Sequence, residues 1–67
     1  MNIQKAAAIA ASAYNVCGPR AGTPATPSTI ANFGKSEILR CMGIYADAHD
    51  GDMFTRNEIM EARELLS

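Results

Sequence analysis

The chain has 67 residues, six Lys and Arg against seven Asp and Glu, and a hydrophobic content of 48%. This length predicts one small domain over residues 1–67, and its core is too small for a buried catalytic cleft, so we expect no enzymatic activity and no cofactor. The net charge of −1 disfavours nucleic acid and anionic membranes as partners, because both attract clustered Lys and Arg.

Residues 2–16 predict the first helix. Asn2 can act as its N-cap, and six Ala residues give the segment high helix propensity. Apolar residues recur along it at three- and four-residue steps, at positions Ile3, Ala7, Ala10, Tyr14 and Cys17. Because Ala side chains remove little surface from water, we expect this narrow face to need a neighbour, such as a second copy of the chain.

A connecting loop is predicted over 18–26, where two Gly and two Pro interrupt any periodic pattern. A second helix is then expected over 27–33, with Thr26 as N-cap and Pro27 in the first helical position. Gly34 can end it with a positive φ, and Ser36 can cap a third helix over 36–47. One bent helix across both segments is the alternative.

The last helix is predicted over 55–66. Thr55 and Glu58 have the spacing of a capping box, and Phe54 and Ile59 that of a hydrophobic staple. The chain is therefore expected to be an all-α bundle of three to four short helices, with dimerisation as a way to complete a small core. The predicted core consists of Ile30, Phe33, Ile38, Leu39, Met42, Tyr45, Phe54, Ile59 and Leu65.

Residues 47–58 resemble an EF-hand calcium loop. Asp47, Phe54, Thr55 and Glu58 match the first, eighth, ninth and twelfth positions of that loop. His49, Gly51 and Asp52 depart from it, because the loop needs oxygen ligands at the third and fifth positions and Gly at the sixth. The resemblance implies a degenerate calcium site using Asp47 and Glu58. The alternative is an ordinary turn followed by the capping box, which needs no metal.

A helix-turn-helix is the first alternative to the leading hypothesis, ahead of the calcium site. Residues 29–40 combine a short helix, the turn residue Gly34 and a helix that begins with polar residues. In this interpretation Ser36 to Arg40 would meet DNA, although Lys35 and Arg40 provide few phosphate contacts. The spacing from Ala31 to Gly34 is also one residue shorter than the usual motif.

The leading hypothesis is a non-enzymatic interaction module, such as a small inhibitor or adaptor that binds and masks a partner protein. Its predicted contact residues are the acidic and apolar side chains of one segment, Asp47, Asp50, Asp52, Met53 and Phe54. An acidic surface of this kind would meet a basic partner surface and mainly add to association rate and specificity. The chain is also expected to self-associate.

A cytoplasmic location is the remaining expectation. Cys17 and Cys41 lack the density and spacing of a disulfide framework or a zinc site, which favours two reduced thiols. The Ala-rich stretch 6–11 is too weakly hydrophobic for an export signal, and no apolar run approaches the ~18 residues of a membrane span.

Overall fold

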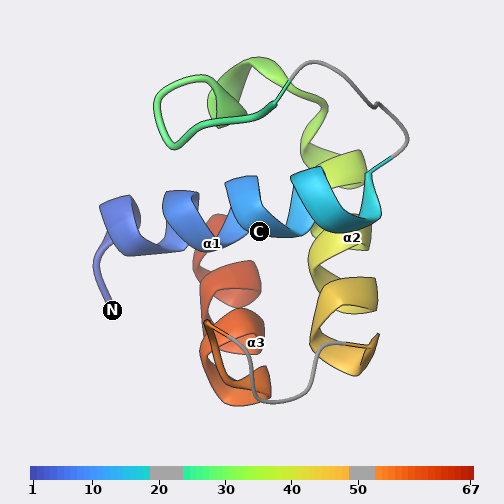
Figure 1. The fold of residues 1–67 in the computed structure, drawn as a ribbon. Helices are drawn as coiled ribbons and strands as arrows, with labels where there is room; N and C mark the ends of the chain where they lie inside the picture. The colour runs from blue at the N-terminus through green and yellow to red at the C-terminus, as the bar shows by residue number, and fades with distance from the viewer. Residues whose placement is uncertain (19–23, 49–52) are drawn as a thin grey trace.

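A computed structural model describes residues 1–18, 24–48 and 53–67, which contain helices and no strand (Figure 1). The elements are α1 (Ile3–Cys17), the short 3-10 helix η1 (Ile30–Asn32), α2 (Lys35–Ala48) and α3 (Arg56–Leu66). Helices α2 and α3 lie side by side, and α1 crosses both of them. The predicted all-α bundle is confirmed. No helix of the described segments is both long enough and apolar enough to cross a lipid bilayer.

Helix α1 is the central element of the core. Its N-cap is Asn2, as predicted, because the Asn2 side chain accepts a hydrogen bond of 2.8 Å from the Lys5 N–H. The α1 residues in the core are Ala6, Ile9, Ala10, Ala11, Ala13 and Tyr14. Ala residues let α2 and α3 approach the α1 backbone closely, so the neighbours that this helix needs come from the same chain.

The predicted apolar stripe of α1 is only partly the face that enters the core. Ala10 and Tyr14 are buried, but Ile3 is 59% exposed and Ala7 and Cys17 are half-buried. Ala6, Ile9 and Ala13, which lie beside this stripe, have no exposed surface. The buried face of α1 is therefore turned about the helix axis relative to the predicted stripe. The prediction missed this because Ala residues lie on nearly every face of the helix, so the sequence pattern alone does not show which face is buried.

The helix predicted over 27–33 is reduced to η1 and the turn before it. The Thr26 carbonyl accepts from the N–H groups of Thr29 and Ile30, and the Thr26 and Thr29 hydroxyls lie 3.0 Å apart. These local hydrogen bonds compete with a regular helix, and extended backbone at Phe33 (φ −92°, ψ 160°) ends the segment. The Thr26–Pro27 signal therefore marks a turn.

Helix α2 starts differently from the prediction. Gly34 does not adopt a positive φ, and its carbonyl accepts the Ile38 N–H at 3.0 Å. The helix begins at Lys35, so Ser36 lies within its first turn and is not its cap. The short helix η1 and helix α2 are thus separate elements, with Phe33 and Gly34 between them. The predicted Ser36 cap and the alternative of one bent helix are both wrong.

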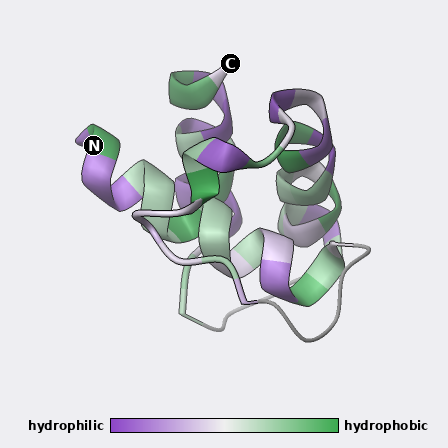
Figure 2. Cartoon of the chain, turned by 90° about the horizontal axis from the view of Figure 1, so that it is seen from above, coloured by the Kyte–Doolittle hydropathy of each residue, from purple (hydrophilic) through white to green (hydrophobic). Residues whose placement is uncertain are grey.

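Helix α3 begins with the predicted capping box. The Thr55 hydroxyl accepts the Glu58 N–H at 3.1 Å, and the Glu58 carboxylate accepts the Thr55 N–H at 3.0 Å. The predicted staple residues pack on the same core, with Ile59 fully buried and Phe54 half-buried. Figure 2 shows hydrophobic and hydrophilic residues interleaved along the helices, as amphipathic packing requires.

Most of the predicted core is confirmed, and two Leu assignments are corrected. Ile30, Ile38, Met42, Tyr45 and Ile59 are buried, and Phe33 packs against them. Leu65 is 46% exposed, and Leu39 is only partly buried. Leu66 packs against the core in place of Leu65, because it continues the face of Ile59 and Ala62 at three- and four-residue steps.

Polar contacts join the helices at their edges. The Lys5 ammonium lies 2.9 Å from a Glu58 carboxylate oxygen, and the amino group of Met1 lies 3.3 Å from Glu61, so the start of α1 is tied to α3. The Arg63 Nε of α3 donates to the Leu39 carbonyl of α2 at 2.8 Å. The first two contacts thus join the start of α1 to α3, and the third joins α3 to α2.

Candidate functional site

An apolar groove lies between α1, the segment that contains η1, the start of α2 and the last turn of α3. It has a volume of about 310 Å³ and is partly open to solvent. Ten of its eleven lining residues are hydrophobic. The lining residues are Ile3, Ala7, Ala10, Pro27, Ile30, Ala31, Phe33, Lys35, Ile38, Leu39 and Leu66.

One wall of the groove belongs to α1. Ile3, Ala7 and Ala10 follow each other at four- and three-residue steps, so they lie on one face of the helix. The sequence pattern had marked this stripe as the face that needs a neighbour. In the structure the neighbouring elements cover it incompletely, and the short Ala side chains leave the space that forms the groove.

The opposite wall is held in place by contacts to the C-terminal half of α1. The Asn15 amide bonds the backbone of Ala25 twice, donating to its carbonyl at 2.9 Å and accepting from its N–H at 2.7 Å. The rings of Tyr14 and Phe33 lie 4.6 Å apart with an interplanar angle of 32°. The Tyr14 hydroxyl also donates to Glu37 at 2.9 Å. The segment from Ala25 to Phe33 is therefore held against α1 at both of its ends.

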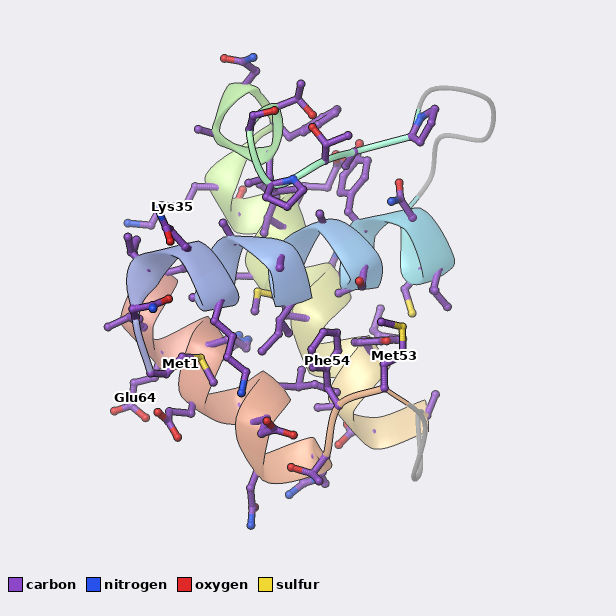
Figure 3. All side chains as sticks on the ribbon, turned by 60° about the vertical axis from the view of Figure 1, so that its left-hand side comes forward. Met1, Lys35, Met53, Phe54 and Glu64 are labelled. Carbon is purple, nitrogen blue, oxygen red and sulfur yellow. The ribbon has the colours of Figure 1, made fainter. Side chains whose placement is uncertain are left out.

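Lys35 is the one ionisable residue among those that line the groove. It is exposed, and it forms no ion pair with another described residue. In Figure 3 Lys35 lies above α1, whereas Met53 and Phe54 lie below it. In this view Lys35 and the described end of the predicted contact segment thus lie on opposite sides of the helix.

The predicted acidic contact surface is described only in part. Asp47 is exposed and forms a 3.3 Å ion pair with Arg56, so its charge is partly compensated within the chain. Met53 is 73% exposed, and Phe54 is half-buried against the core. Asp50 and Asp52 lie outside the described residues. The described part of this segment therefore offers one strongly exposed apolar side chain, Met53.

The calcium hypothesis depends on Asp47 and Glu58. Both Glu58 carboxylate oxygens already accept hydrogen bonds. One accepts from the Thr55 N–H of the capping box, and the other accepts from the Lys5 ammonium. The Thr55 N–H and the Lys5 ammonium lower the pKa of Glu58 from 4.5 to about 2. A bidentate bond to calcium would have to break both contacts. The described residues contain no cluster of three or more His, Cys, Asp or Glu suited to a metal, and His49 lies outside them.

The DNA-binding alternative gains few cations from the fold. Lys5 and Arg56 are in ion pairs, and Arg63 is bonded to the α2 backbone. Among the described basic residues Lys35 and Arg40 remain, both exposed in the first half of α2, and Arg20 lies outside the described residues. Two such charges give few phosphate contacts, and the element before them is a single 3-10 turn instead of a supporting helix.

The two thiols are free, with Cys41 buried in the core and Cys17 half-buried. Burial raises the pKa of Cys41, an effect that the nearby Arg40 charge only partly opposes. A buried thiol with a raised pKa is a poor nucleophile and acts as a small apolar side chain.

Sequence reasoning did not identify the groove residues as a site. The sequence does not link Pro27, Ala31, Lys35 and Leu66 to one another, because they lie in the turn before η1, in η1, in α2 and in α3. The one available signal was the stripe of α1 that begins at Ile3. No family model, no curated protein and no solved structure matches this chain.

Proposed function

We propose that the protein is a non-enzymatic interaction module that binds an amphipathic helix of a partner protein in the apolar groove. The observation that carries this proposal is the lining itself, because ten hydrophobic residues and Lys35 face one open groove. An amphipathic helix recognises such a surface by inserting apolar side chains at three- and four-residue steps. Masking of a partner, as by an inhibitor or adaptor, follows from binding of this kind.

Exposed large apolar side chains occur in the lining of the groove and next to it in the sequence. Ile3 in the α1 wall is 59% exposed, and Leu65 next to the Leu66 wall is 46% exposed. Contiguous exposed apolar residues with a polar rim are typical of protein interaction sites. The volume of about 310 Å³ is at the low end for ligand pockets, which suits a few anchoring side chains of a longer segment.

A partner protein fits the charge of the groove better than a second copy of the chain. In a symmetric dimer the same patch meets itself, so two Lys35 ammonium groups would approach each other. The other lining residues carry no acidic group that could compensate them. Self-association through this groove is therefore disfavoured.

The test is a selection of displayed amphipathic helical peptides on the full chain, followed by affinity measurements on the selected peptides. Ala31 is exposed and lines the groove, whereas Ala48 is exposed at the end of α2 outside it. We expect Ala31→Gln to weaken binding by about tenfold, because a polar side chain then occupies the groove. Ala48→Gln adds the same group elsewhere and should leave affinity unchanged.

Two results would overturn the proposal. Either no peptide is enriched, or the enriched peptides bind the Ala31→Gln and Ala48→Gln proteins equally well. A concentration-dependent dimer that only Ala31→Gln dissociates, measured by analytical ultracentrifugation, would replace the partner helix with a second copy. Circular dichroism of both variants checks that the helices are retained.

A further inference from the structure

We infer that the partner helix carries a carboxylate beside its apolar anchors, and that Lys35 pairs with this carboxylate and so fixes the direction in which the helix lies. This inference rests on the proposed function and specifies its partner. It concerns the one charged residue of a groove whose other lining residues are hydrophobic.

The Lys35 ammonium group is not paired with an acidic side chain in the described part of the chain. Three described basic side chains have clear partners, since Lys5 pairs with Glu58, Arg56 with Asp47, and Arg63 with the Leu39 carbonyl. Lys35 forms no such contact in the described residues. It is also the first residue of α2, where the helix dipole disfavours a cation, so its charge does not stabilise the helix that carries it.

The position of Lys35 allows one side chain to make both an apolar and a charged contact with the partner helix. Its aliphatic stem can line the groove while its ammonium group stays in water at the rim. Figure 3 shows the Lys35 side chain above α1. A partner carboxylate beside Lys35 would meet a positive charge, whereas an orientation of the helix that moves this carboxylate away from Lys35 would leave both charges without a partner.

The test uses the peptides selected on the groove. Lys35→Met removes the charge and keeps an apolar stem, and we expect it to weaken binding by about three- to fivefold. Lys35→Glu should weaken it by about tenfold or more, because it replaces attraction with repulsion. Arg40→Glu changes the net charge by the same amount at an exposed residue outside the groove, and should have a much smaller effect.

A charge exchange completes the experiment. A peptide in which this Glu is replaced by Lys should bind the Lys35→Glu protein well, and it should bind the Arg40→Glu protein weakly because that protein keeps Lys35. Selected peptides that lack an acidic residue, or that lose nothing when Glu becomes Gln, would overturn the inference. In that case the Ala31→Gln result still decides the proposed function, so the two failures are distinguishable.

Discussion

At the scale of single residues, the Glu58 carboxylate links two helices. One oxygen closes the capping box of α3 with the Thr55 N–H, and the other accepts from the Lys5 ammonium of α1. Both contacts favour the ionised form, which explains why the pKa of Glu58 falls to about 2. The group therefore couples a local helix start to the crossing of α1 over α3.

This coupling predicts a dependence of stability on pH. Because the folded chain binds the Glu58 proton more weakly than the unfolded chain, the stabilisation is complete above pH 4.5 and is lost as the pH falls towards 2. Glu58→Gln keeps the capping geometry but does not titrate. We predict that its thermal midpoint falls less steeply over this range than that of the wild type.

Glu64→Gln is the matched control, because Glu64 is exposed and its side chain is in no ion pair with a described residue. Its pH profile should follow the wild type. Parallel profiles for the wild type and Glu58→Gln would contradict the role assigned to the carboxylate.

Replacement of Gly by Ala is expected to change the stability of the protein in opposite directions at Gly18 and Gly43. A Cβ at Gly18 would collide with the Tyr14 carbonyl oxygen, whereas a Cβ at Gly43 would sit at an ordinary 3.6 Å from Arg63 Nε. We predict that Gly43→Ala stabilises the protein by about 0.5–1 kcal/mol, since Gly is a poor residue within a helix. Gly18→Ala should destabilise it, because the backbone must shift. Urea unfolding measures both changes, and equal midpoints for the two variants would refute this difference.

At the scale of elements, the segment before η1 depends on contacts with α1. Thr26 and Thr29 organise their own turn, but this turn is placed against α1 by Asn15, Tyr14 and Phe33. The 3-10 helix has three residues, too few to be stable alone. The groove wall formed by this segment therefore depends on the Asn15 amide. It bonds the Ala25 N–H and carbonyl, which in a regular helix would be bonded to other backbone groups.

Removing this amide should loosen the wall without unfolding the bundle. Ala25 is 5% exposed, so Asn15→Ala leaves a buried N–H and a buried carbonyl without their partner. We predict a loss of about 1–3 kcal/mol. Hydrogen exchange at the Ala25 amide should accelerate at least about tenfold, while amides within α3 keep their protection.

Asn15→Asp is the informative comparison, because it retains the acceptor for the Ala25 N–H and loses the donor to the carbonyl. Its Ala25 amide should exchange at a rate between those of the wild type and Asn15→Ala. Unchanged exchange in Asn15→Ala would show that the wall does not depend on this side chain.

At the scale of the whole molecule, the core is built around a helix of small residues. The Cα radius of gyration is 10.4 Å, close to the roughly 11 Å of a compact domain of this length. Ala6, Ala10 and Ala13 have no exposed surface, so α2 and α3 approach the α1 backbone closely. Ala thus stabilises the fold through close contact of helices and not through a large buried side chain.

Enlarging this contact should force the helices apart. We predict that Ala13→Leu destabilises the protein by about 1–3 kcal/mol or more through overpacking. Ala8 lies on the same helix and is only half-buried, so Ala8→Leu should change stability far less. Chemical unfolding of both variants tests the prediction, and a stable Ala13→Leu protein would show that α1 does not pack as closely as described.

Local sequence signals determined the ends of two helices. Asn2 and the Thr55–Glu58 pair act on backbone groups within four residues, so their chemistry can be read without a fold. The hydrophobic period likewise identified Ile38, Met42, Tyr45 and Ile59 as buried. Leu65 was assigned wrongly because both Leu65 and Leu66 fit an apolar helix end, and only packing distinguishes them.

By itself, then, the sequence determined an all-α chain, the caps of α1 and α3, and the buried Ile, Met and Tyr residues that follow α1, because caps and periodicity depend on neighbours along the chain. Only the tertiary structure decided which face of α1 meets α2 and α3, and that η1 is a single turn. It alone assembled the groove, since Ala7, Ala31 and Leu66 meet through contacts between distant segments. Such contacts depend on shape and packing, for which a lone Ala or Lys residue carries no sequence signal.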